Sequence, residues 1–132
     1  MAYEFKKFEG RNSRQEKRLT LTKSNQIGFP ARFYKDNEIK KFKYVVLYWD
    51  AKNRAIGVYF TNNEDEKNKF SIMHSKKGYG GIVAIRSFLR VYNIDPKVYH
   101  GRYEWEKYNL AGVGEIFLFK LTENQAEQEV EK

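Results

Sequence analysis

The sequence predicts an α+β domain in which a strongly twisted antiparallel sheet carries one principal helix, at about residues 82–93. Two observations lead to this fold class. Short apolar runs separated by turn residues, about eight in all, are typical of antiparallel strands. Only residues 82–93 place apolar side chains at the 3.6-residue spacing of an amphipathic helix. A chain of 132 residues has the usual length of a single domain.

Residues 18–29 predict a first hairpin. Residues 18–23 alternate polar and apolar side chains (Arg-Leu-Thr-Leu-Thr-Lys), and residues 26–29 return after a Ser-Asn turn. Pro30 follows directly, and its fixed φ and missing N–H suit the first position of a helix. We therefore expect one helical turn after this hairpin.

Residues 44–61 predict a second hairpin. The run Tyr-Val-Val-Leu-Tyr-Trp at residues 44–49 is apolar without alternation, and residues 54–61 return with Ile56, Val58 and Phe60 on one face. A strand without alternation is covered on both faces, either by the domain itself or by a second subunit. We expect a homodimer.

The rest of the chain predicts three more strands and the principal helix. The strands are expected at residues 70–74, 98–105 and 115–121. The helix ends before Pro96, because the residue that precedes a proline disfavours helical geometry. Its apolar face consists of Ile82, Ile85, Phe88, Leu89 and Tyr92.

One expected strand carries a row of aromatic side chains. By alternation Tyr99, Tyr103 and Trp105 share one face of the strand at residues 98–105. Such a row can stack unpaired bases, but large aromatic side chains are more often core in a small domain. We interpret this face as core.

The charge balance favours an anionic partner. The chain has 25 Lys and Arg against 17 Asp and Glu, a net charge of +8, and residues 122–132 contain four acidic residues and one basic residue. We expect a basic flexible arm at residues 1–17, a single domain at residues 18–121 and an acidic flexible tail at residues 122–132. A strongly basic domain favours nucleic acid over a membrane surface.

Composition also argues against several classes of protein. The chain has no cysteine, which fits a reducing, cytoplasmic compartment. No apolar run approaches the ~20 residues of a membrane span, so we expect no membrane partner. With only two histidines we expect no metal or other cofactor. No local signature of a catalytic nucleophile is present, and we expect a protein that is not an enzyme.

The sharpest local pattern is Ser-Lys-Lys-Gly-Tyr-Gly-Gly at residues 75–81, directly before the expected helix. Glycines let a backbone approach a ligand closely, and the free N–H groups of a helix start attract phosphate. Lys76 and Lys77 supply charge, and Tyr79 supplies a ring for a base. The alternative is a glycine-rich turn with solvated lysines. It is not a Walker loop, because no lysine follows the glycines.

Other cations complete the predicted nucleic-acid surface. They are Arg18, Lys23, Arg32, Arg86 and Arg90. Arg86 and Arg90 are four residues apart and therefore share one face of the expected helix. We interpret the basic run at residues 40–43 (Lys-Lys-Phe-Lys) as a solvated turn rather than a site.

Part of the chain resembles a known family. Residues 19–21 (Leu-Thr-Leu), residues 26–33 (Gln-Ile-Gly-Phe-Pro-Ala-Arg-Phe) and the hairpin at residues 44–60 resemble the swapped-hairpin pattern of AbrB-like transition-state regulators. In that family two chains intertwine and bind DNA, so the resemblance implies a DNA-binding homodimer. Residues 41–43 (Lys-Phe-Lys) depart from the pattern, which usually has Gly-Asp there. The layout is also similar to single-stranded-DNA-binding coactivators and Whirly-type regulators.

These observations predict a non-catalytic, regulatory nucleic-acid-binding protein. DNA is favoured over RNA, and single-stranded DNA is one of the expected forms. The alternative is a small structural or accessory interaction protein, of the kind that viruses or plasmids encode, without nucleic-acid binding. An enzyme would need a cleft that gathers acidic residues or His100.

Overall fold

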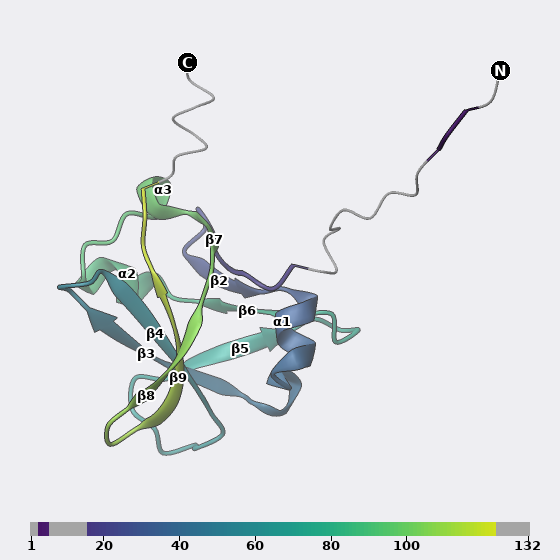
Figure 1. Cartoon of the computed structure of the whole chain (residues 1–132). Helices are drawn as coiled ribbons and strands as arrows, with labels where there is room; N and C mark the ends of the chain where they lie inside the picture. The colour runs from purple at the N-terminus through teal and green to yellow at the C-terminus, as the bar shows by residue number, and fades with distance from the viewer. Residues whose placement is uncertain (1–2, 6–15, 124–132) are drawn as a thin grey trace.

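The computed structural model describes residues 3–5 and 16–123 (Figure 1). The predicted basic arm and acidic tail therefore lie largely outside the described residues. Nine strands form one antiparallel sheet in the order β7-β1-β2-β6-β5-β3-β4-β9-β8. The strands are β1 (Leu19–Leu21), β2 (Gln26–Phe29), β3 (Tyr44–Asp50), β4 (Ala55–Thr61), β5 (Phe70–His74), β6 (Gly81–Ala84), β7 (Gly101–Tyr103), β8 (Glu106–Leu110) and β9 (Gly114–Lys120).

The helices of the described residues are all short. They are α1 (Ala31–Asp36), the 3-10 helix η2 (Ile39–Lys41), α2 (Arg86–Val91) and α3 (Pro96–Tyr99). None of them is long and apolar enough to cross a membrane. The fold is therefore α+β with a dominant curled sheet, which confirms the predicted class, but residues 16–123 contain no principal helix.

The core lies where the two ends of the curled sheet face one another. Alternate residues of several strands point inward, so Ile27 and Phe29 of β2 are buried together with Val58 and Phe60 of β4. The predicted hairpins at residues 18–29 and 44–61 are confirmed, with β1 pairing β2 and β3 pairing β4. The helical turn between them is also confirmed, because α1 begins directly after Pro30.

Phe33 of α1 fills one end of the core. Its ring centroid lies 5.8 Å from that of Phe29, 5.2 Å from that of Phe117 and 5.2 Å from that of Trp105. These rings belong to β2, to β9 and to the link between β7 and β8. The short helix α1 thus joins both ends of the sheet.

The predicted helix at residues 82–93 is wrong. Residues 81–84 form β6, which pairs with β2 on one side and with β5 on the other, and only residues 86–91 are helical. Ile82 and Val83 are β-branched and suit a strand. The apolar spacing resembled that of one continuous helix for two reasons. Val83 and Ile85 point inward as alternate positions of an extended chain, and Phe88 and Leu89 of α2 then pack into the same core.

The expected strand at residues 98–105 is also shorter than predicted. Residues 96–99 form α3, and β7 covers only residues 101–103. The interpretation of its aromatic side chains as core is confirmed. Tyr103 belongs to the buried core, and Tyr99 and Trp105 pack against it.

A carboxylate at the start of the described domain joins two arginines. Glu16 accepts hydrogen bonds from Nε and Nη2 of Arg18 at 2.8 and 2.9 Å, and its Oε2 lies 3.4 Å from Nη1 of Arg102. The hydrogen bonds from Arg18 lower the pKa of Glu16 from 4.5 to about 2. This cluster fixes the chain just before β1.

Replacing Glu16 by glutamine should lower stability in a pH-dependent way. The folded state holds the pKa of Glu16 below its unfolded value, so the contribution is present above pH 4.5 and is lost as the pH falls toward 2. We expect a loss of about 1 kcal/mol at pH 7, since Arg18 and Arg102 are partly solvated. Urea unfolding at pH 7, 5 and 3 measures this loss in the free energy of unfolding.

The exposed pair of Lys107 and Glu115, 3.8 Å apart, provides the control. Glu115→Gln should change the free energy of unfolding by much less than Glu16→Gln at every pH. A loss for Glu16→Gln that stays constant down to pH 3 would contradict the assigned pKa.

Candidate functional site

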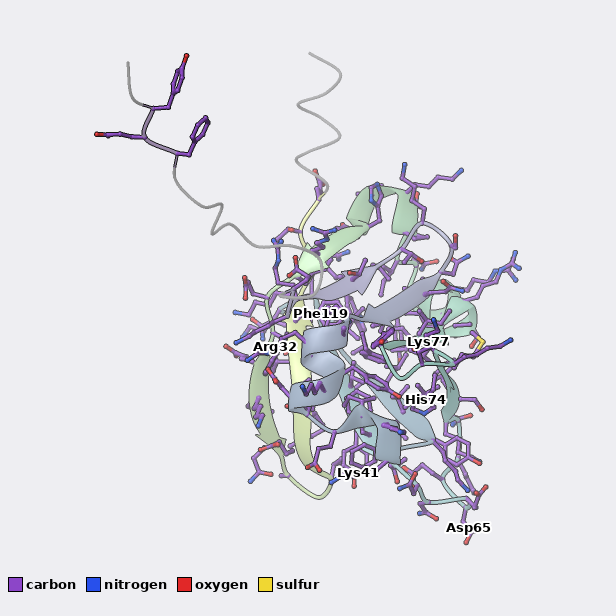
Figure 2. All side chains as sticks on the ribbon, turned by 90° about the vertical axis from the view of Figure 1, so that its right-hand side faces the viewer. Arg32, Lys41, Asp65, His74, Lys77 and Phe119 are labelled. Atoms are coloured by element: carbon purple, nitrogen blue, oxygen red, sulfur yellow. The ribbon has the colours of Figure 1, made fainter. Side chains whose placement is uncertain are left out.

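A groove of about 790 Å³ lies between α1, η2 and the loop that joins β5 to β6. We call it the lysine groove. Its lining residues are Ala31, Tyr34, Lys35, Glu38, Lys40, Lys41, Gly78 and Tyr79. Figure 2 shows Lys41, His74 and Lys77 on the side of the molecule that carries α1.

The first wall comes from α1 and the turn that follows it. Ala31, Tyr34 and Lys35 lie three and four residues apart and therefore share one helix face. The ring of Tyr34 is almost fully buried, and this burial raises the pKa of its hydroxyl. The wall is thus an apolar floor with a lysine at its edge.

The second wall is the loop at residues 75–80. Ser75 closes it, because its N–H donates to the Gly80 carbonyl at 2.9 Å and its hydroxyl accepts from the Tyr79 N–H at 2.7 Å. Gly80 has a φ of +150°, and a Cβ there would lie 2.7 Å from the Phe29 carbonyl oxygen. Only glycine allows the loop to approach the start of α1 so closely.

His74 ties both walls together. Its Nε2 lies 2.8 Å from the Phe42 carbonyl at the end of η2, and its Nδ1 lies 2.7 Å from the Tyr34 hydroxyl. A carbonyl only accepts, so Nε2 donates to it, and in the neutral ring Nδ1 then accepts from Tyr34. β5 therefore holds the floor of the groove and the end of η2 in place.

The rim of the groove is positively charged. Lys35, Lys40 and Lys41 are exposed on one side, and Lys76 and Lys77 are exposed in the opposite loop. Glu38 is the one acidic side chain among the described lining residues, and it lies 3.6 Å from Lys41 with both side chains exposed. Such an exposed pair is weak, so the rim keeps a net positive charge.

The structure brings together three of the predicted site residues, Lys76, Lys77 and Tyr79, which share the β5–β6 loop. Arg86 and Arg90 lie on α2, at the other end of β6 and ~13 Å or more away along the strand. Figure 1 shows α2 and this loop on opposite sides of the molecule. The glycine pattern therefore leads into the strand β6 and not directly into a helix.

Lys23 belongs with the α2 group. It lies in the turn between β1 and β2, and this turn reaches α2 because the Ile85 N–H donates to the Asn25 carbonyl at 2.8 Å. Arg86 and Arg90 line a shallow hollow of about 470 Å³ beside Asn25. The three cations Lys23, Arg86 and Arg90 thus form a second basic region.

Two predicted cations are held by carboxylates. Arg18 pairs with Glu16, as described above, and Nε of Arg32 lies 3.0 Å from Oδ2 of Asp36 one turn later in α1. Because their charge is largely balanced locally, we do not include Arg18 and Arg32 in the candidate surface.

Sequence reasoning missed the α1–η2 wall. Lys40 and Lys41 were visible as a basic run but were interpreted as a solvated turn, and Lys35 and Tyr34 carried no local pattern. The missing information is the contact between Tyr34 of α1 and His74 at the end of β5, which joins residues 40 positions apart.

Acidic residues are unevenly distributed over the domain. Residues 17–35 and 67–94 contain no Asp or Glu at all. We call these two ranges the acid-free segments, and the sheet places them side by side through the β1–β2 and β2–β6 pairings. Of their basic residues, Arg18 and Arg32 are paired with Glu16 and Asp36, as described above, and do not count toward the candidate surface. The others are Lys17, Lys23, Lys35, Lys67, Lys69, Lys76, Lys77, Arg86 and Arg90.

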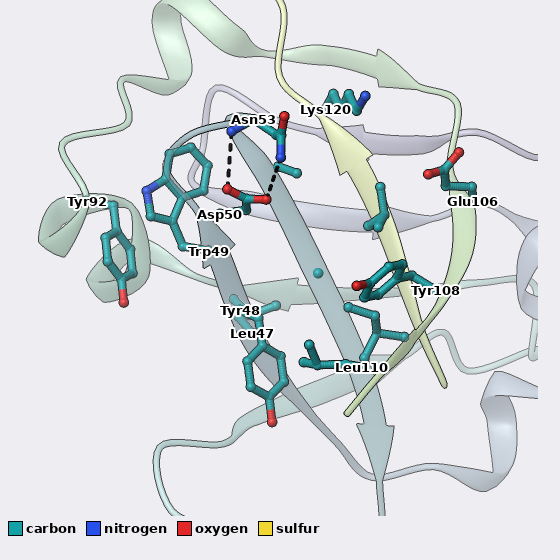
Figure 3. A pocket seen from close by; sticks show the side chains of 14 residues that line it. Leu47, Tyr48, Trp49, Asp50, Asn53, Tyr92, Glu106, Tyr108, Leu110 and Lys120 are labelled. Carbon is teal, nitrogen blue, oxygen red and sulfur yellow. Dashed lines mark hydrogen bonds between the residues drawn. The ribbon is translucent and has the colours of Figure 1, made fainter. Parts of the chain in front are cut away.

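A second hollow, of about 610 Å³, lies on β3, β4, β8 and β9 (Figure 3). Tyr48, Tyr108 and Leu110 line it, and Ile116 packs over Gly57 at its centre. At its edge Asp50 accepts hydrogen bonds from Asn53, which lower the pKa of Asp50. This face is aromatic and carries Glu106 and Lys120, so it lacks the one-sided charge of the lysine groove.

No family model, curated protein or solved structure matches this chain. The described residues also contain no group of three or more His, Asp or Glu side chains placed to hold a metal ion. The interpretation of function therefore depends on the geometry and charge described above.

Proposed function

We propose that this protein is a non-catalytic, regulatory nucleic-acid-binding protein whose lysine groove and acid-free segments contact the phosphate backbone. The observation that supports this proposal most is the absence of acidic residues from residues 17–35 and 67–94, which lie side by side in the sheet. Lysine and arginine that neutralise phosphates release counterions, which drives binding. The resemblance of residues 18–61 to DNA-binding regulators favours DNA.

Binding should weaken steeply as salt rises. With about five phosphate contacts from the lysine groove, affinity for a single strand should fall about a hundred-fold between 50 and 200 mM salt. The measurement is fluorescence anisotropy with labelled 20-nucleotide probes of single-stranded DNA, duplex DNA and RNA. Absence of binding to every probe at 50 mM salt would contradict the proposal.

A pair of double variants distinguishes binding through this surface from binding through the net charge of the protein. Lys76→Gln/Lys77→Gln should reduce the slope of log affinity against log salt by about 1.5, because two phosphate contacts are lost. Lys52→Gln/Lys120→Gln removes the same charge from the β3–β4 turn and from β9, and it should leave the slope nearly unchanged. Equal losses in both variants would show that net charge alone decides binding.

The aromatic hollow favours a second candidate, self-assembly of the chain. Tyr108 and Leu110 lie on β8, an edge strand of the sheet, so a second copy could cover this face. Light scattering tests it directly. A dimer mass that Leu110→Asp converts to a monomer would support assembly through this face, and a monomer mass for the unchanged protein would contradict it.

A further inference from the structure

We propose that the lysine groove holds an unpaired base, so that the preferred partner is a single strand rather than a duplex. This inference rests on the proposed function and names the form of nucleic acid that the groove suits. The argument comes from three properties of the groove: an apolar interior, a cationic rim and an exposed aromatic ring.

The interior suits the flat face of a base. Ala31, Gly78 and the small exposed part of the almost fully buried Tyr34 line it, together with the aliphatic stems of Lys35, Lys40 and Lys41. A Cβ added at Gly78 would meet no atom within 4 Å, so the space beside the loop is open. A volume of about 790 Å³ lies within the range of about 300–1,000 Å³ typical of small-ligand sites.

Tyr79 offers the stacking surface. It lies at the groove, yet its side chain is 70 % exposed, so its ring is not used by the core. The hydrogen bond from its N–H to the Ser75 hydroxyl holds the backbone of the loop at this position. A loop that is already closed loses little backbone freedom when a base stacks on the ring of Tyr79.

The positive charges at the rim of the groove complement the phosphates of a nucleotide whose base occupies its interior. Lys35, Lys40 and Lys41 line the groove on one side, and the exposed Lys76 and Lys77 belong to the loop that supplies Gly78 and Tyr79 on the other. A base that enters the groove therefore brings its own phosphates to the rim. In a duplex the base faces are covered by their stacked neighbours, so only the phosphates would reach these lysines.

The test uses the full chain and a 12-nucleotide probe with one central 2-aminopurine, as a single strand and as a duplex, in DNA and RNA form. Anisotropy measures affinity, and 2-aminopurine fluorescence reports stacking. Tyr79→Ala should weaken single-strand binding about ten-fold and abolish the fluorescence change, since one stacked base is lost. Duplex affinity should stay unchanged, and Tyr79→Phe should retain single-strand binding.

Tyr108→Ala is the matched control, because Tyr108 is 51 % exposed on the opposite part of the sheet and should leave both affinities unchanged. If Tyr79→Ala binds single strands as well as the unchanged protein does, while Lys76→Gln/Lys77→Gln binds weakly, the base site is wrong and the proposed function stands. If no probe binds, both fail.

Equal single-strand affinity for DNA and RNA would support a site that reads only the unpaired base, and a preference for one would support the same site with a contact to the sugar.

Discussion

Replacing Phe33 by alanine is expected to lower the free energy of unfolding by about 3–5 kcal/mol. The ring is 1 % exposed and contacts rings from both ends of the sheet, among them Phe29 and Phe117. Its removal leaves a cavity that these neighbours fill only in part, because they are anchored in β2 and β9. Urea or thermal unfolding followed by circular dichroism measures the loss.

Phe5→Ala removes the same ring from an exposed position. Phe5 is 90 % exposed, so its substitution should change stability by less than about 0.5 kcal/mol. A loss for Phe33→Ala no greater than that for Phe5→Ala would show that α1 does not close the core as described.

Replacing Gly80 by alanine is expected to cost about 3 kcal/mol of stability and to distort the lysine groove. The added Cβ meets two penalties at once: a φ of +150°, and a distance of 2.7 Å to the Phe29 carbonyl oxygen, which is backbone and cannot turn aside. The close contact is relieved only if the loop at residues 75–80 moves away from α1. The variant should therefore unfold more easily and bind nucleic acid less tightly.

Gly78→Ala separates the two penalties. Gly78 also has a positive φ, of +72°, but no atom lies within 4 Å of an added Cβ. It should lose only about 1 kcal/mol, the cost of the left-handed conformation for a residue with a side chain. Similar losses for Gly78→Ala and Gly80→Ala would mean that the close approach to Phe29 is not important.

The hairpins at residues 18–29 and 44–61 could be predicted because their signals are local. Alternation, turn residues and a return strand all fall within about 20 residues there. The strand at residues 81–84 could not be predicted in the same way. Its two pairing partners, β2 and β5, are defined only in the folded sheet, and the apolar spacing of Ile82 and Ile85 suited a helix equally well.

The candidate site shows the same difference between signals that are local in the sequence and contacts that form only in the folded chain. Lys76, Lys77 and Tyr79 are neighbours in the sequence, so their glycine-rich pattern was visible directly. Lys40 and Lys41 join them only because His74 ties β5 to both Tyr34 and the end of η2. Arg86 stays apart because β6 is extended, and an extended strand separates its ends further than a helix of equal length.

Because the acid-free segments contain no Asp or Glu and the rest of the described domain contains many, we expect the molecule to have an electric dipole. The polyanion proposed above would turn the protein during approach, so that salt would slow association as well as weaken the final complex.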